Sequence, residues 1–561
     1  MRLQGEVGLR DNVSWQKGTH LVRAGGTFSR ASVNFFRDDG QVGLVKPAYL
    51  ITQTSGLNIP AAYRPPACSA SLTTNCLPSN QNSNWNNLYA QALGLVDQGL
   101  VVDARGSDLS ALPLGTPLFN HVIYDTFSFY ATDSWKITPT LTVNYGVNWS
   151  VEMPPTDETG KQALSVILPN NQVLVPENYL VARQQAALAG NVYNPAVGFT
   201  PISATGRKYP YDLVLDTVAP RLALAWNPQV QGGWLSRIFG NNKTVIRGGY
   251  GTLFDRLNGV QKVGNALQGF GFQQTLTCLG PSRTGQCLGV SGVDPSSAFR
   301  AGVDGSTVPI PPLTASATPP LVPGAASFPG ANQPLANTTY QIDPQYRPGR
   351  NHQWDVTLQR EMPGHALLEI GYIGRHANNI YNPLEVNGVP FMMTLNGQSY
   401  AQAFDAIATQ LKAGGGVTPQ PFLEAALAGS SFCAAPNASC TAGVVSRYSG
   451  SFPIQRVTDV WNGIQPAFKF GPATAATNQV QTMFYWASAG WANYNAGFVS
   501  YRTRSYKGLT VDGNVTWAHS LDTRGLNQDF DTAASNSYNL HYDYGTSIFD
   551  RKAEEINNLY N

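Results

Sequence analysis

Six cysteines are the residues of this sequence whose spacing most directly indicates chemistry. They fall in three close pairs: Cys68 with Cys76, Cys278 with Cys287, and Cys433 with Cys440. None has the CxxC spacing of a zinc site or a thioredoxin-like motif. Each pair lies in a segment rich in Pro, Ser, Thr and Asn without a strand pattern. We therefore predict three local loop disulfides, which form in an oxidising compartment.

Two groupings resemble enzyme motifs but lack the context that their chemistry requires. His519, Ser520 and Asp522 are adjacent on a predicted strand end, where neighbouring side chains point to opposite faces, so a catalytic triad is not expected. The segment RGGYGTLFDR (247–256) has several glycines, but a phosphate-binding loop needs a strand–loop–helix context and this segment reads as a strand. The sequence therefore predicts neither an enzyme nor a bound cofactor.

A carboxylate grouping near the end of the chain is the candidate for calcium binding. Asp529, Asp531 and Asp543 lie in or beside a long loop. Their spacing lacks the pattern of an EF-hand loop. We interpret them as part of a solvated loop, and we predict no metal site.

The elements that position these residues are strands with alternating side chains. Between residues 125 and 149, Phe127, Phe129, Trp135 and Ile137 share one parity, whereas the other parity holds small polar residues. One apolar face and one small polar face fit a strand with lipid on one side and water on the other. A soluble sandwich would show the same parity, so the number and order of the hairpins carry more weight.

The hairpins and their connections follow a regular order. About 11 strands are predicted: 4–16 with 19–36, 125–137 with 141–150, 213–227 with 242–255, 348–362 with 365–380, 490–505 with 508–522, and one beginning near 547. Short turns alternate with long segments that we expect to be structureless: 37–120, 154–212, 256–346, 381–489 and 523–546. Outer-membrane barrels alternate short periplasmic turns with long external loops in this way. All three cysteine pairs fall in these long connecting segments.

Five charged residues lie within the predicted strands: Arg247, Asp355, Arg502, Arg504 and Asp512. A charge that faces lipid at mid-depth costs about 2–4 kcal/mol. We therefore expect these side chains to face a water-filled lumen or to lie at the membrane edges.

The bulk composition agrees with a membrane barrel. Charged residues make up 12% and aromatic residues 11% of the chain, which is too little charge for an ordinary soluble surface. No run of about 18 apolar residues indicates a membrane-spanning helix. The net charge of +2 gives no basis for nucleic-acid binding. The first 30 residues lack the apolar core of a signal peptide, so we expect the natural N-terminus to lie upstream.

Several stretches resemble TonB-dependent outer-membrane receptors, especially the Oar-like group. They are FYATDSWKITPTLTVNYGVNW (129–149), APRLALAWNP (219–228), KTVIRGGYGTLFDR (243–256), RNHQWDVTLQREMPGHALLEIGYIGRH (350–376), ANYNAGFVSYRTRSYKGLTVDGNVTWAHSLD (492–522) and DYGTSIFDR (543–551), with the shorter DNVSWQKGTHLVRAGG (11–26). The resemblance implies a barrel of about 22 strands filled by an N-terminal plug. It also implies a short box before the plug that contacts TonB, and often a small carboxypeptidase-regulatory-like domain.

On this resemblance, residues 1–561 are a partial antiparallel transmembrane β-barrel domain, with about 11 of about 22 strands and long extracellular loops. We expect the plug and the closing strands to lie outside the chain. Eleven strands leave two edges that lipid cannot satisfy, so we predict that this chain does not transport alone. The strand charges would then line the lumen or contact the plug.

The function that the resemblance implies is uptake of a bulky nutrient, such as a glycan, a peptide or a metal chelate, across the outer membrane of a Gram-negative bacterium. The expected partners are outer-membrane lipid and lipopolysaccharide, the TonB complex through the missing N-terminal region, and an unknown extracellular ligand. One alternative is an adhesion or structural barrel without active transport. Another is a secreted soluble β-protein that binds or cleaves glycans, but the sequence offers no paired-carboxylate site for cleavage.

Overall fold

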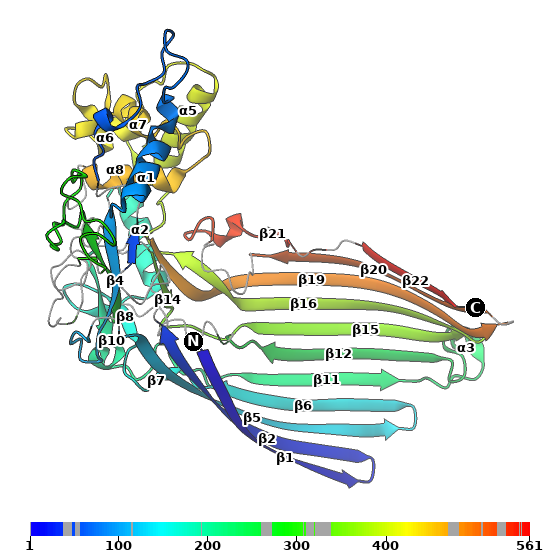
Figure 1. Cartoon of the computed structure of the whole chain (residues 1–561). Helices are drawn as coiled ribbons and strands as arrows, with labels where there is room; N and C mark the ends of the chain where they lie inside the picture. Colours follow the sequence, from blue (N-terminus) through cyan, green and yellow to red (C-terminus); the bar gives the residue numbers. More distant parts are fainter. Residues whose placement is uncertain are drawn as a thin grey trace.

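One large antiparallel sheet dominates the computed structural model (Figure 1). The structure describes residues 2–37, 48–50, 57–113, 116–191, 193, 195–257, 259, 272–306, 308–309, 319, 338–468, 482–506, 509–523, 534–548, 550 and 553–560. The long strands of the sheet are β1 (Arg2–Lys17), β2 (His20–Arg37), β5 (Leu118–Thr138), β6 (Leu141–Glu152), β11 (Val218–Trp226), β12 (Thr244–Phe254), β15 (Arg350–Met362), β16 (Ala366–Glu385), β19 (Thr482–Tyr506), β20 (Leu509–Asp522) and β22 (Ala553–Tyr560).

The sheet follows chain order from β1 to β20, and β22 pairs with β20. Every neighbouring pair of these strands is antiparallel. This confirms the predicted all-β antiparallel fold and the alternation of short turns with long connections. Among the described strands, no pairing joins β1 to β20 or β22, so the sheet is curved but open.

The predicted strand limits were wrong at several places, and β5 and β19 begin earlier than expected, at Leu118 and Thr482. The strand expected from 213 begins at Val218, because residues 211–217 instead lie against β6, where Trp149 Nε1 donates to the carbonyl of Leu215 at 2.7 Å. The last strand, expected from about 547, begins at Ala553, because 545–546 form only the short bridge strand β21 beside β20.

One face of the sheet carries polar side chains and glycines. Cross-strand pairing places Gly146, Arg221, Gly251, Gln353 and Arg375 in one row across five strands. Side chains on a strand alternate between faces, so residues two positions along each strand share this face.

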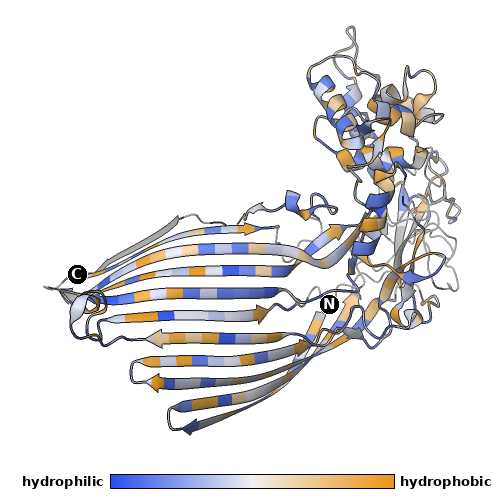
Figure 2. Ribbon diagram, turned by 180° about the vertical axis from the view of Figure 1, so that it is seen from behind, coloured by the Kyte–Doolittle hydropathy of each residue, from blue (hydrophilic) through white to orange (hydrophobic). Residues whose placement is uncertain are grey.

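The opposite face is apolar and uncovered by protein. Tyr145, Leu222, Tyr250 and Trp354 form the neighbouring row. Leu222 is 53% exposed, and Val7 on the same face is 72% exposed. Figure 2 shows apolar and polar residues interleaved along these strands. Such an extended apolar surface needs a partner, because soluble monomers rarely expose contiguous apolar patches of this kind.

The long connections are not structureless, which corrects the expectation from composition. Beside the large sheet they form helices α1 (Asn82–Leu93), α2 (Pro176–Leu188), α5 (Tyr400–Lys412), α6 (Pro421–Ala426), α7 (Cys440–Tyr448) and α8 (Val457–Ile464), with α3 (Gly233–Phe239) between β11 and β12. They also contain the short strands β3 (Ala48–Leu50), β4 (Gln98–Ala104), β7 (Thr156–Asp157), β8 (Ala163–Ile167), β9 (Gln172–Val173), β10 (Val197–Pro201), β13 (Gln273–Leu279), β14 (Thr338–Ile342), β17 (Thr394–Leu395) and β18 (Gln398–Ser399). Figure 1 shows that α1 and α5–α8 gather at one end of the sheet.

Residues 389–468, which we call the helical head, pack around a core of their own. Ser399 caps α5 in a capping box with Gln402, which fixes the start of the helix. The ring of Tyr400 then meets Trp461 edge-on, with ring centroids 4.9 Å apart. Trp461 is fully buried, so this loop behaves as a small globular unit.

All three predicted disulfides are present: Cys68–Cys76, Cys278–Cys287 and Cys433–Cys440. No helix in the described part of the chain is both long and apolar enough to cross a membrane.

Candidate functional site

Three adjoining cavities run from the loops onto the polar face of the sheet. The first, which we call the sheet cavity, has a volume of about 660 Å³. Its lining includes Asn144, Arg221, Gln353, Asp355 and Arg375, which come from four strands and all lie on the polar face. Gly146, Gly249 and Gly251 also line this cavity, and their lack of side chains leaves the space open.

The second cavity, the rim cavity, lies where β6, β11 and β12 reach the loops and has a volume of about 120 Å³. Glu152 and Asp255 line it together with Arg256. Arg256 Nη2 donates to Ser150 Oγ at 3.1 Å. Burial raises the pKa of the Asp255 carboxyl above its ordinary value. The rim cavity is therefore a narrow polar passage with charges of both signs.

The third cavity, the mouth cavity, is the largest, with a volume of about 1,050 Å³. It lies where α2, the segments 212–216 and 343–347, the ends of β16 and β19, and the segment 537–541 come together. Volumes of this size hold ligands as large as an oligosaccharide or a short peptide.

The cavities adjoin because they share lining residues. Arg221 and Leu253 line both the sheet cavity and the rim cavity. Val214 and Tyr346 line both the rim cavity and the mouth cavity. The three cavities are therefore neighbours, in order from the loops to the polar face.

Hydrogen bonds between distant segments hold the walls of the mouth cavity. Arg207 pairs with Asp212 at 2.7 Å and donates to the carbonyl of Pro344 at 3.2 Å. The backbone N–H of Arg347 donates to Ser488 Oγ at 2.8 Å, and the Arg347 guanidinium pairs with Asp216. These contacts join two loops to β19 and give the cavity a defined shape.

The mouth cavity is rich in carboxylates and aromatic rings. Its acidic residues are Glu177, Asp212, Asp216 and Asp343, whereas Arg347 is its arginine and is already paired with Asp216. Asp343 is 9% exposed, and burial raises the pKa of its carboxyl to about 6. The cavity therefore offers hydrogen-bond acceptors and little free positive charge.

Aromatic rings supply the apolar part of the lining. Trp491 lies 4.9 Å from the ring of His541 and 5.7 Å from that of Tyr544, measured between centroids. Tyr346, which meets Tyr211 edge-on at 5.1 Å, and Tyr538 also line the cavity. Flat rings beside carboxylates and amides suit a ligand with both apolar and hydroxylated faces.

The strand charges singled out in the sequence lie on the polar face, as the pairing of Arg247 with Ala225 and of Asp355 with Gly249 shows. The Asp355 carboxylate lies over Gly249, where a Cβ atom would come within 2.8 Å of its Oδ1. On the next strands, Arg502 Nε donates to Asp512 Oδ2 at 2.9 Å. The side chain of Arg504 lies outside the described residues. That these charges face a water-filled lumen stays a prediction.

The groupings that resemble enzyme motifs are not assembled as sites. His519 pairs with Asp550 at 2.9 Å, and the backbone of Ser520 donates to the same carboxylate. RGGYGTLFDR lies largely within β12. In the part of the chain that the structure describes, no three His, Cys, Asp or Glu residues gather as a metal site. Asp529 and Asp531 lie outside it, and Asp543 accepts the N–H of Ser535 at 2.7 Å.

A family model described as an outer membrane beta barrel domain matches residues 2–559. This chain belongs to the family of outer-membrane β-barrel domains. It is an outer-membrane protein. A search of curated proteins finds no match.

Solved structures of outer-membrane transporters are similar to this barrel domain. The transporter YddB from Escherichia coli is 8% identical with a TM-score of 0.33, and the alignment covers 95% of this chain and 44% of that one. The copper transporter OprC is 6% identical with a TM-score of 0.30, over 92% and 37%. The ferric-catecholate import receptor Fiu from E. coli K12 is 8% identical with a TM-score of 0.29, over 95% and 40%. The chain thus spans less than half the length of these transporters.

Proposed function

We propose that this barrel domain belongs to a TonB-dependent receptor that takes up a bulky nutrient, such as a glycan, a peptide or a metal chelate. The observation that supports this function is the route of three adjoining cavities from the loops to the polar face. A barrel used only as an anchor needs no such route. In this proposal the loops select the ligand, the barrel frames the path, and a plug outside this chain is moved by TonB.

Among the three classes of nutrient, the lining of the mouth cavity favours a glycan. A ferric chelate with net negative charge would meet the carboxylates of Glu177, Asp212 and Asp343 and would find Arg347 already paired. A neutral sugar can stack on Trp491 and donate its hydroxyl protons to these carboxylates. Of the three carboxylates only that of Asp343 is buried, and a buried acceptor is costly unless a hydrogen-bond donor satisfies it.

Isothermal titration of the purified chain with a panel of neutral oligosaccharides tests this function. Loss of the indole in Trp491→Ala removes a stacking surface worth about 0.5–1.5 kcal/mol, so we expect an affinity about twofold to tenfold lower. Trp517→Ala is the matched control, because Trp517 lies 60% exposed on the apolar face, away from the cavity. It should bind as the unaltered chain does.

If Trp491→Ala and the unaltered chain bind the oligosaccharide with equal affinity, the mouth cavity is not the binding site. Tight binding of an anionic ferric chelate without binding of any glycan would contradict the proposal of a glycan as ligand. It would still agree with uptake through the three cavities. Nutrient uptake by cells that carry the whole gene should stop when TonB is deleted.

Adhesion is the second candidate, and the separately packed helical head favours it. A folded unit beyond the strand ends can serve as a recognition module for another cell or a matrix. This alternative predicts cell attachment that depends on residues 389–468 and uptake that does not respond to the loss of TonB.

A further inference from the structure

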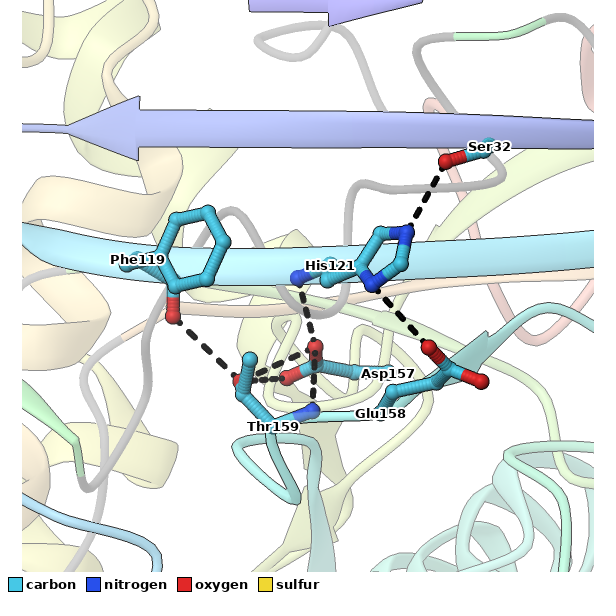
Figure 3. Close-up of polar contacts among 6 residues, drawn as sticks. All are labelled: Ser32, Phe119, His121, Asp157, Glu158 and Thr159. Carbon is cyan, nitrogen blue, oxygen red and sulfur yellow. Dashed lines mark hydrogen bonds and ion pairs between the residues drawn. The ribbon is translucent and has the colours of Figure 1, made fainter. Parts of the chain in front are cut away.

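A serine, a histidine and a glutamate that are far apart in the sequence lie in hydrogen-bond contact at the rim of the sheet (Figure 3). Ser32 Oγ on β2 lies 2.8 Å from Nε2 of His121 on β5. His121 Nδ1 lies 3.0 Å from Oε2 of Glu158, which directly follows β7. Because an ionised carboxylate only accepts, Nδ1 carries the proton and Nε2 of the neutral ring accepts the hydroxyl proton of Ser32. This is the arrangement that activates a serine for nucleophilic attack.

Glu158 is held beside His121 by its neighbour Asp157, which is buried. The Asp157 carboxylate accepts the backbone N–H of His121 at 2.9 Å, that of Thr159 at 3.2 Å and that of Lys161 at 2.9 Å. These bonds already fasten the turn to β5. The turn is therefore anchored without the ion pair of Glu158, so the contact of Glu158 with His121 is free to orient the imidazole ring.

The three residues lie on the apolar face of the sheet, just beyond its aromatic rows. The rings of Phe28 and Phe127 lie tilted to each other on one side of Ser32, with centroids 5.1 Å apart, and those of Phe36 and Phe119 stack at 4.7 Å on the other side. On β1, Ser32 pairs with Gly5, around whose Cβ position no atom lies within 4 Å. Ser32 itself is partly buried and lies between apolar rings, where the apolar face of the sheet meets the loops.

We propose that Ser32, His121 and Glu158 form an acyl-ester hydrolase site at the outer rim of the barrel, with lipid-like esters as substrates. Ser32 is the nucleophile, His121 the general base and acid, and Glu158 the residue that orients the imidazole. The flanking phenylalanine pairs contact the acyl chain. Asn34, on the same face and paired with His121, provides an amide N–H for the developing oxyanion.

The reaction needs no reactant other than the ester and water. Ser32 Oγ bonds to the carbonyl carbon as its proton passes to His121 Nε2. The bond from that carbon to the alcohol oxygen then breaks, and His121 returns the proton to the departing alcohol. Water attacks the acyl-serine, its proton passes through His121 to Ser32 Oγ, and the free carboxylic acid leaves. The site is independent of the cavities and of the proposed uptake function.

Labelling of the purified full chain in detergent micelles with a fluorophosphonate probe tests this proposal. We expect one modified residue, Ser32, by peptide mass spectrometry, and slow hydrolysis of p-nitrophenyl dodecanoate. Ser32→Ala should abolish both, and His121→Gln should lower both rates by about 100-fold or more, as loss of a general base does. Ser29→Ala, on the other face of the same strand, is the matched control and should label fully.

Heat-dependent migration on gels shows whether each variant keeps its folded barrel. Absence of probe at Ser32 in the folded, unaltered chain would overturn the proposal. So would labelling of folded His121→Gln at the unaltered rate, because the contacts would then only fasten β2 to β5.

Discussion

The sheet and the helical head use similar apolar residues but bury them in opposite ways. In the sheet, apolar side chains repeat every second residue and face outwards, so that Val7 and Leu222 are more than half exposed in the protein alone. In the head, Tyr400, Phe404 and Ile407 repeat at helical spacing, face inwards and are buried. We propose lipid as the partner of the first set, whereas the second set packs against other protein.

The two regions are therefore stabilised by different interactions. In lipid, the sheet gains little from contact among its outer side chains and depends on its complete ladder of backbone hydrogen bonds. The head gains from removal of apolar area from water and from close packing. Substitutions should therefore have effects that depend on region as well as on residue type.

The largest expected effect is at the centre of the head. Trp461→Ala removes a fully buried indole that touches Tyr400 and Phe468. Loss of a large buried aromatic costs about 3–5 kcal/mol, so we expect the head to unfold at much lower urea concentration. Near-ultraviolet circular dichroism and limited proteolysis measure this change.

The same substitution should leave the sheet intact, because the head has a core of its own. Trp234→Ala serves as the control, since Trp234 on α3 is 70% exposed. Unfolding of sheet and head together in Trp461→Ala would show that the two regions form one cooperative unit.

The sequence identified the sheet but not the head. Alternation along 125–149 and the short turn at 138–140 locate the hairpin of β5 and β6, although β5 begins at Leu118 rather than at 125. Composition does not reveal the head, because its Pro, Gly and Ser content is also typical of loops. The helical spacing of Tyr400, Ala403, Phe404 and Ile407, after the Ser399 cap, was the signal that could have found it.

The second effect tests the sheet and its two faces. Leu222→Arg places a charge on the lipid face of β11, which costs about 2–4 kcal/mol at mid-depth and less towards the interface. Ala223→Arg, one residue along, directs the same charge into the sheet cavity and should cost much less. Urea titration of the chain folded into vesicles measures both. A greater loss of stability in Ala223→Arg would reverse the assignment of the faces.

Neither the cavities nor the serine site could be found from the sequence. The mouth cavity takes residues from α2, the segment 343–347 and β19, whose contacts arise only when the loops fold back on one another. Ser32 and His121 are 89 positions apart. No periodic pattern in the sequence connects residues that are so far apart. Strand pairing in a meander, by contrast, joins segments that follow one another in the chain, so the sequence pattern predicts it.

The smallest of these effects is expected at Asp343 in the mouth cavity, where the end of the sheet meets the loops. Its carboxyl has a pKa of about 6 in the folded protein, raised by burial from an ordinary value of 3.8. The charged form is therefore disfavoured by folding. The resulting cost is absent below about pH 4, grows as the pH rises towards 6, and reaches on the order of 3 kcal/mol at pH 8.

Asp343→Asn removes this charge and keeps an oxygen that can accept the N–H of Gln345, which donates to Asp343 at 2.8 Å. We therefore expect the variant to be more stable than the unaltered chain at pH 8 and nearly equal to it at pH 4, in urea titrations at both values. Asp405→Asn, at an exposed position of α5, controls for the change of residue type and should shift stability by about 0.5 kcal/mol or less. An equal difference at both pH values would mean that water reaches Asp343, and the mouth cavity would then be an open groove rather than an enclosed pocket for a ligand.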